Sequence, residues 1–121
     1  MVKAKIRKQV KQRANGRCED CGRRILPNET ITGHLNHVRD KNYTNPGNLV
    51  NRCLLCETEY HLKYSNDPQE IGLTKKHNDA TILGHFKRLA EEEQTYLVDR
   101  YALLLEGVFK RLNLTDSFGI I

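Results

Sequence analysis

The sequence has no hydrophobic run that approaches the roughly 20 residues needed to cross a bilayer. Its first residues, MVKAKIRKQVKQR, have no apolar core of the kind that marks a secretory signal. It also has no internal repeat and no low-complexity tract. With 121 residues, of which 38% are hydrophobic and 29% charged, the chain is expected to form a single domain, 1–121, that stays in the cytoplasm and has no membrane partner.

Four cysteines stand in this chain without an export signal, and in a reducing compartment paired cysteines usually bind metal or carry out redox chemistry. Cys18 and Cys21 form one Cys-x2-Cys pair, and Cys53 and Cys56 form a second pair, with 31 residues between the two pairs. Each pair can present two thiolates, at about 2.3 Å, to one tetrahedral Zn²⁺. The spacing predicts a structural zinc with no open coordination position. The alternative is four buried free cysteines.

Positive charge is concentrated near the start of the sequence. Residues 1–24 hold nine Lys or Arg and two acids, whereas residues 91–121 hold three Lys or Arg and six acids. A basic segment of this density can attract the phosphate backbone of DNA without reading its sequence. The alternative is a solvated helix face. The expected phosphate contacts are Lys3, Lys5, Arg7, Lys8, Lys11 and Arg13.

Apolar spacing predicts an α+β fold. Residues 3–14 place apolar side chains at helical spacing, and Asn15-Gly16 is expected to end that helix. A hairpin is expected around 25–32, a loop over 39–48, a helix over 57–64 and a linking loop over 65–78. Steps of three and four predict one long helix over 79–112, or two helices with a break near 93–95. His77 and His85 are expected at the surface.

The stretch between the cysteine pairs carries a recognisable run. Asn36-His37-Val38 is followed by Asn48-Leu49-Val50, and then by Cys53-x2-Cys56-Glu57 and Tyr60-His61. This run resembles the motif of the HNH nucleases, in which an Asp or His precedes a His, followed by Asn-Leu and Cys-x-x-Cys-His. The likeness covers roughly residues 10–64. It implies a small ββα-metal core with zinc knuckles, here with a basic helix before it and a helical extension over about 79–112 after it.

The resemblance also implies roles for individual residues. His37 would be the general base that deprotonates the attacking water, and Asn48 would orient the His37 loop and ring. Asn36, Glu57 and His61 would hold one divalent cation. Phosphodiester hydrolysis needs these groups: an imidazole titrates near neutral pH, and a cation neutralises charge that builds on the leaving oxygen. The implied activity is metal-dependent cutting of DNA, as a nick or through both strands.

Two positions depart from the family pattern. Asn36 stands where Asp or His is commoner, and Glu57 stands where His is commoner. On a helix, positions 57 and 61 share one face, so a carboxylate and an imidazole can meet one ion. An oxygen-richer site favours Mg²⁺ or Mn²⁺. His34 shares a strand face with Asn36 and is either a replacement ligand or a strand histidine near DNA or solvent.

Three functional hypotheses follow from these features. The first is the endonuclease. The second is a catalytically degenerate HNH-like zinc module that only binds nucleic acid, which needs the cysteines and the basic segment but not His37 and Asn48. The third is a zinc-ribbon module for protein interaction, which accounts for the acidic helix at 79–112 but not for the HNH-like run. The apolar stripe of that helical segment needs a partner, which is the core, a second copy in a homodimer, or both.

Overall fold

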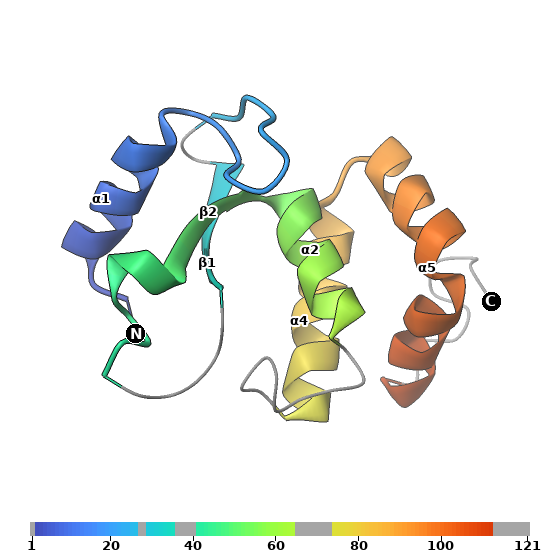
Figure 1. Ribbon diagram of the computed structural model, residues 1–121. Helices are drawn as coiled ribbons and strands as arrows, with labels where there is room; N and C mark the ends of the chain where they lie inside the picture. The colour runs from blue at the N-terminus through green and yellow to red at the C-terminus, as the bar shows by residue number, and fades with distance from the viewer. Residues whose placement is uncertain (1, 27–28, 36–40, 65–73, 113–121) are drawn as a thin grey trace. The chain divides into compact units, whose positions relative to one another are not determined.

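A computed structural model of the chain describes residues 2–26, 29–35, 41–64 and 74–112 (Figure 1). Within these ranges the protein is a small α+β structure with four α-helices and a two-stranded antiparallel sheet, so the expected α+β class is confirmed. The elements are α1 (Ala4–Ala14), β1 (Thr30–His34), η2 (Pro46–Asn48), β2 (Leu49–Cys53), α2 (Leu54–Lys63), α4 (Lys75–Arg88) and α5 (Glu91–Arg111). Among them is no helix with the length and apolar character that a membrane span requires.

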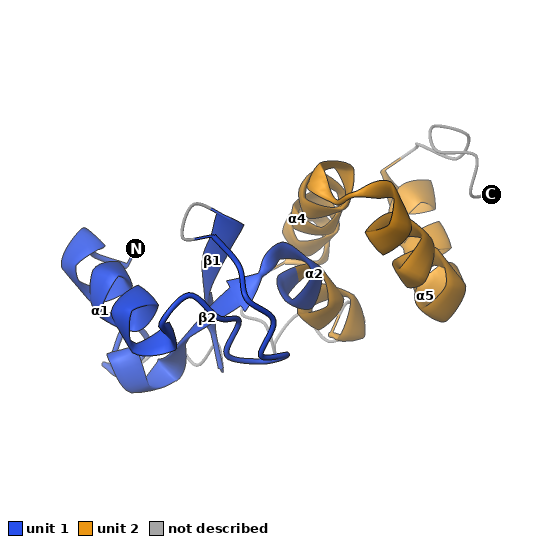
Figure 2. Ribbon diagram, turned by 90° about the horizontal axis from the view of Figure 1, so that it is seen from above, with its two compact units in different colours: residues 1–57 blue, residues 58–121 orange. Residues whose placement is uncertain are grey.

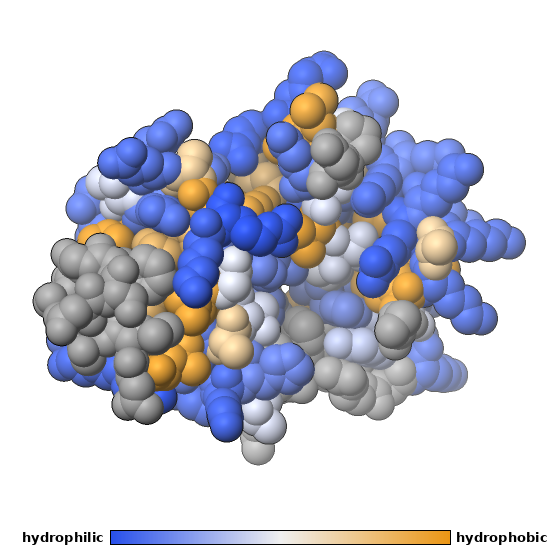
Figure 3. Space-filling view, turned by 180° about the vertical axis from the view of Figure 1, so that it is seen from behind, coloured by the Kyte–Doolittle hydropathy of each residue, from blue (hydrophilic) through white to orange (hydrophobic). Residues whose placement is uncertain are grey.

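The chain divides into two compact units, Met1–Glu57 and Thr58–Ile121 (Figure 2). The boundary falls inside α2, so this helix begins in the first unit and ends in the second. On the face drawn in Figure 3, hydrophilic side chains cover most of the surface, and hydrophobic ones appear between them in small patches. The single domain over 1–121 stays a prediction, and the two units are described separately.

Helix α1 forms and ends as its sequence predicts. Val10 is fully buried on its apolar stripe and packs in a small cluster with Val2 and Leu49. The helix ends at Asn15, which adopts the left-handed conformation (φ 53°) and donates its backbone N–H to the carbonyls of the last turn. Gly16 follows at φ 78°, a conformation that glycine adopts without steric cost.

The sheet is antiparallel and pairs Thr30 with Cys53 at one end and His34 with Leu49 at the other. Every residue of β2 is buried, and β2 runs directly into α2. The expected hairpin around 25–32 is wrong, because β1 finds its partner at Leu49–Cys53 and not in the preceding residues. The local hairpin lies earlier, where Arg17 pairs with Arg24 across the first cysteine turn.

The second unit contains α4 and α5. Helix α4 begins at Lys75, where the Thr74 hydroxyl accepts the His77 backbone N–H at 3.1 Å, so the expected linking loop ends earlier than 78. The two-helix alternative holds, but the break lies at Leu89 and Ala90, whose backbones are extended. Glu93, expected at the break, belongs to the first turn of α5, where its carboxylate accepts the Ala90 N–H.

The apolar stripe of these helices is largely buried, with one change of phase. Leu97 and Val108 are fully buried as the spacing predicts. After a kink at Tyr101, where φ is −130°, Leu105 and Phe109 are buried in place of Tyr101 and Leu104. The kink rotates the last turns of α5 relative to the first turns, so a stripe drawn for one straight helix loses its register. The buried apolar residues of α4 are Ile82 and Phe86, with Leu89 at its C-cap.

Candidate functional site

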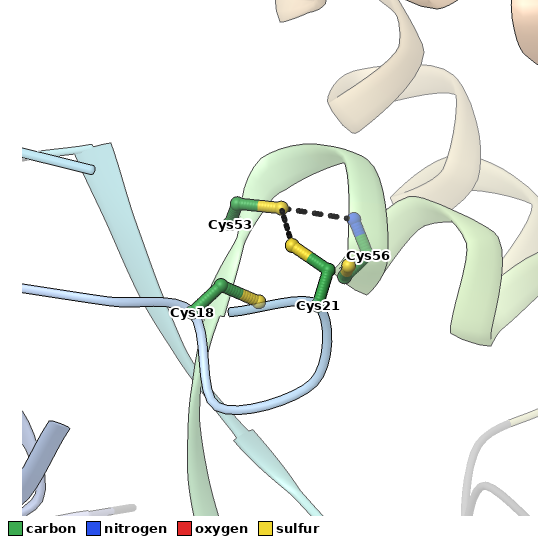
Figure 4. Close-up of side chains that lie close together, drawn as sticks. All are labelled: Cys18, Cys21, Cys53 and Cys56. Carbon is green, nitrogen blue, oxygen red and sulfur yellow. Dashed lines mark hydrogen bonds between the residues drawn. The ribbon is translucent and has the colours of Figure 1, made fainter. Parts of the chain in front are cut away.

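The four cysteines converge (Figure 4). Their Sγ atoms all lie within 4.8 Å of one another, and none is in a disulfide. The Sγ atoms of Cys21 and Cys53 are 4.0 Å apart. Four thiolates placed at about 2.3 Å around a tetrahedral zinc ion would be separated by about 3.8 Å, close to this distance. The cluster has the ligand type and the spacing to hold a metal ion such as zinc.

Two local structures place these sulfurs. In the first knuckle, the Gly22 N–H donates to the Cys18 carbonyl at 2.8 Å, and the Cys18 N–H donates to the Arg23 carbonyl at 2.9 Å. Gly22 closes this turn at φ 77°. In the second knuckle, Cys53 ends β2, and the N–H of Cys56 in the first turn of α2 donates to Cys53 Sγ at 3.5 Å. The turn of the first knuckle, the end of β2 and the start of α2 therefore all lie beside the four sulfurs.

The pKa values of Cys21, Cys53 and Cys56 are shifted in different directions. A hydrogen bond from the Cys56 thiol, helped by the Cys56 N–H, lowers the pKa of Cys53 to about 5 despite burial. The pKa of Cys56 is raised, first because its proton is held by Cys53, then by burial and by the negative charge of Cys53. Burial is the main cause of the raised pKa of Cys21. Without a cation, Cys53 is therefore favoured as the thiolate over Cys21 and Cys56, and a dication would allow these two thiols to ionise as well.

The residues expected to form the catalytic site are only partly within the described ranges, and Asn36 and His37 lie outside them. Asn48 ends η2 immediately before β2. Its side-chain Nδ2 donates to the Tyr43 carbonyl at 3.0 Å, and its own carbonyl accepts the Leu35 N–H at 2.8 Å. Asn48 thus contacts Leu35 and Tyr43, two residues of the segment 35–48 that connects the two strands.

Glu57 is 5% exposed and lies in the first turn of α2. Its Oε1 accepts a hydrogen bond from Arg52 Nη1 at 3.0 Å, in an ion pair buried on both sides. Arg52 also donates to Asp20 and, at 3.3 Å, to the His34 carbonyl. Gly33 lies against this pair, because a Cβ there would fall 2.7 Å from Arg52 Nη1. Sequence reasoning missed Arg52, although an arginine in a stretch that begins with Leu49-Val50 is a signal that it has an acidic partner.

His34 lies in β1, as expected for a strand histidine. Its ring stacks on Tyr43, with centroids 4.2 Å apart and planes 15° apart. This stacking joins β1 to the same connecting segment that Asn48 contacts. Whether His34 replaces Asn36 as a ligand stays a prediction, because Asn36 lies outside the described residues.

His61 belongs to the second unit and is 6% exposed. Its Nδ1 lies 2.7 Å from Oδ1 of Asn78, and its backbone carbonyl accepts the Asn78 side-chain N–H at 3.4 Å. Asn78, on α4, is fully buried. Sequence reasoning missed it because the segment around 65–78 was expected to be a polar loop. No sequence signal marks Asn78, since its role depends on where α4 packs.

The two remaining histidines of α4 differ. His77 is exposed, as expected. His85 is half-buried, so the expectation of a surface residue is wrong: its ring packs edge-on at 5.8 Å from the His61 ring. Its Nδ1 is buried and has no hydrogen-bond partner among the described residues. Burial, followed by the proximity of His61 and Arg88, lowers the pKa of His85 to about 4, so this ring is neutral at pH 7.

The basic residues of α1 divide into two groups. Lys3, Lys5, Arg7 and Lys8 are exposed, and Lys11 is half-buried. An open hollow on this helix is bordered by Ala4, Arg7, Lys8, Lys11 and Gln12.

Arg13 differs from these residues because its guanidinium is engaged within the fold. It forms two hydrogen bonds to the Glu19 carboxylate, at 2.7 and 2.9 Å, and donates to the carbonyls of Pro46 and Leu49. The Arg13 bond is the main cause of the lowered pKa of Glu19. Arg13 therefore ties α1 to the first knuckle and to the start of β2.

Comparison of the chain with protein-family models, with curated proteins and with solved structures finds no match. Two groups of residues are candidates for function on their own geometry. One is the thiol cluster of the first unit. The other, in the same unit, comprises Asn48 and the buried pair of Glu57 and Arg52. The pair of His61 and Asn78 belongs to the second unit.

Proposed function

We propose that the chain is a metal-dependent endonuclease of the HNH type, which hydrolyses phosphodiester bonds of DNA. The observation that carries this proposal is the agreement between the HNH-like run and the local structure. Asn48 precedes β2, which pairs antiparallel with β1 and continues directly into α2, and α2 bears both Glu57 and His61. An order of two strands and a helix is what the resemblance implies, and it supports a ββα-metal core here.

In this mechanism His37 accepts the proton of the attacking water. Asn48 would orient the His37 loop and ring, and its bonds to Tyr43 and Leu35 fix its own position in the fold. A divalent cation would supply charge neutralisation at the scissile phosphate. The donors present fit Mg²⁺ or Mn²⁺: Glu57 offers Oε2, the oxygen outside the Arg52 bond, and His61 offers a ring nitrogen. Asn36 would complete the set.

In the same proposal the thiol cluster binds a structural zinc. Four thiolates suit Zn²⁺ and leave it no open position for substrate, so this metal would hold the fold and take no part in hydrolysis. The zinc would join the first knuckle to the junction of β2 and α2, the helix that carries the cation donors. Loss of zinc should therefore remove the support of the catalytic residues.

The exposed basic residues of α1 would contact DNA phosphates without base preference. Lys5, Arg7 and Lys8 are available for this, whereas the bonds of Arg13 within the fold compete with a phosphate contact. A homodimer through the C-terminal helices would place two sites on one duplex. Leu103 on α5 is 83% exposed and offers an apolar contact for such a partner.

A second candidate function is a nucleic-acid-binding zinc module without activity. The buried ion pair between Glu57 and Arg52 favours it. A carboxylate already neutralised by an arginine has less need of a cation and binds one more weakly. The endonuclease hypothesis requires the Glu57 carboxylate to bind Arg52 and a cation at the same time.

A plasmid assay separates the two functions. Supercoiled DNA is incubated with the zinc-loaded protein, with and without Mg²⁺ or Mn²⁺, and nicked and linear products are resolved on a gel. We expect metal-dependent cleavage that His37→Ala reduces by about 10²–10⁴ in rate, because the substitution removes the proton acceptor. Excess Mn²⁺ should partly rescue Glu57→Ala and His61→Ala, but it should not rescue His37→Ala.

His77→Ala is the matched control, since it removes an exposed imidazole from α4 and should cut like the wild type. Cleavage by His37→Ala at the wild-type rate would contradict the assignment of the base. A wild type that binds DNA but cuts under no divalent metal would favour the binding module.

A further inference from the structure

The orientation of the Asn78 side-chain amide determines which nitrogen of the His61 ring carries a proton. The Asn78 Nδ2 donates to the His61 carbonyl at 3.4 Å, which places the amide oxygen on the side of the ring. With the amide turned over, two oxygens would face each other and this bond would be lost. Oδ1 accepts only, so the ring nitrogen at 2.7 Å must carry the proton.

A ring protonated at Nδ1 and neutral overall carries its lone pair at Nε2. Within the described residues, the bond to Asn78 is the hydrogen bond that the His61 ring makes, and it engages Nδ1. The ring also packs edge-on against His85 and on the edge of Tyr60, which restrict its rotation. A ring turned by 180° would place a C–H against Asn78 Oδ1. The packing and the hydrogen bond therefore favour one orientation and one tautomer.

We infer that Asn78 is a positioning residue, which holds His61 as the Nδ1–H tautomer and so presents the Nε2 lone pair to a divalent cation. This inference rests on the proposed function, in which His61 is a cation ligand. It extends that function to α4, outside the run that resembles HNH nucleases. A histidine that ligates a metal through one nitrogen commonly donates its other N–H to a carboxylate or carbonyl oxygen, and an amide oxygen serves in the same way.

The burial of Asn78 agrees with this role. Its side chain is fully buried, and a buried amide costs free energy unless its polar atoms are hydrogen-bonded. Its oxygen and nitrogen are both directed to His61. Its neighbour Asp79 is buried to the same degree but binds Arg111, at 2.6 and 3.0 Å. The two residues thus provide a test pair with equal burial and different partners.

The test uses the full, zinc-loaded chain with ¹⁵N-labelled histidine and has two readouts. A long-range ¹H–¹⁵N spectrum without added metal identifies the protonated nitrogen of His61, with the signals assigned by their loss in His61→Gln. Titration with Mn²⁺ alone then measures cation affinity. We expect the wild type to show the Nδ1–H form. Asn78→Leu should lose this preference and bind Mn²⁺ about 10–100-fold more weakly.

Asp79→Asn is the matched control, and it should lower the melting temperature yet keep the tautomer and the Mn²⁺ affinity. Asn78→Asp keeps an oxygen acceptor beside Nδ1 and should retain both, which makes the test independent of whether Asn78→Leu folds. Persistence of Nδ1–H in folded Asn78→Leu would overturn the inference. Equal Mn²⁺ affinity in Asn78→Leu and the wild type would overturn it as well, as would loss of the tautomer in Asn78→Asp. A wild type that binds Mn²⁺ through His61 but cuts no plasmid would refute the nuclease proposal alone and leave the inference supported.

Discussion

Substitution of Gly33 by alanine tests whether the buried ion pair beside β1 is as tightly packed as its geometry indicates. An alanine Cβ at this position would lie 2.7 Å from Arg52 Nη1 and 2.8 and 2.9 Å from the two carboxylate oxygens of Glu57. Cβ atoms do not approach other atoms so closely, so the two charged groups must move. Arg52 is 4% exposed and Glu57 is 5% exposed, so neither can move into solvent without leaving the other buried.

The decrease in the free energy of unfolding caused by Gly33→Ala can be bounded by two known effects. Overpacking a buried site costs about 1–3 kcal/mol, and complete loss of one partner from a buried ion pair costs about 3–5 kcal/mol. Both charged groups remain in Gly33→Ala and can shift, so we expect a destabilisation of about 1–3 kcal/mol. The free energy of unfolding would be measured by urea denaturation in excess zinc, followed by circular dichroism. Gly47→Ala is the control in the same unit, since its Cβ would lie 3.4 Å from the Asn45 side chain, an ordinary contact.

Gly47→Ala should change the free energy of unfolding by no more than about 0.5 kcal/mol. The loss in Gly33→Ala combined with Glu57→Ala should be smaller than the sum of the two single losses, because removal of the carboxylate makes room for the methyl group. Equal stability of Gly33→Ala and Gly47→Ala, or strict additivity in the double variant, would refute the packing argument.

Two further predictions concern metal and DNA. Metal analysis should find about one tightly bound zinc per chain. Cys53→Ser should lose zinc and the fold of its unit together, since binding energy at such a site is folding energy. A zinc-free wild type that unfolds cooperatively at the same urea concentration as the zinc-loaded protein would contradict this. Lys5→Gln with Lys8→Gln should weaken DNA binding and lower the slope of log affinity against log salt by roughly 1 per lost phosphate contact, measured by fluorescence anisotropy. The control, Lys76→Gln, removes an exposed lysine of α4, and an equal loss in this variant would refute a specific role for α1.

Features that depend on neighbouring residues were predictable from the sequence. The end of α1 at Asn15 follows from the tolerance of Asn and Gly for the left-handed conformation. The convergence of Cys18 with Cys53 follows from ligand spacing, because two x2 turns suit one tetrahedral metal. The α+β class follows from short β-prone and longer helix-periodic stretches. In each case the physical cause acts within a few residues or through a known ligand geometry.

Other features were settled by packing between segments distant in the sequence. The ion pair between Arg52 and Glu57 forms in the space left by Gly33, and the bond between His61 and Asn78 forms where α4 packs against α2. The phase of the buried stripe after Tyr101 depends on a kink that periodicity does not reveal. Sequence patterns report which residues prefer a helix, a strand or a metal. Which buried polar groups pair with each other depends on the shapes of the packed segments, and only the tertiary structure decides it.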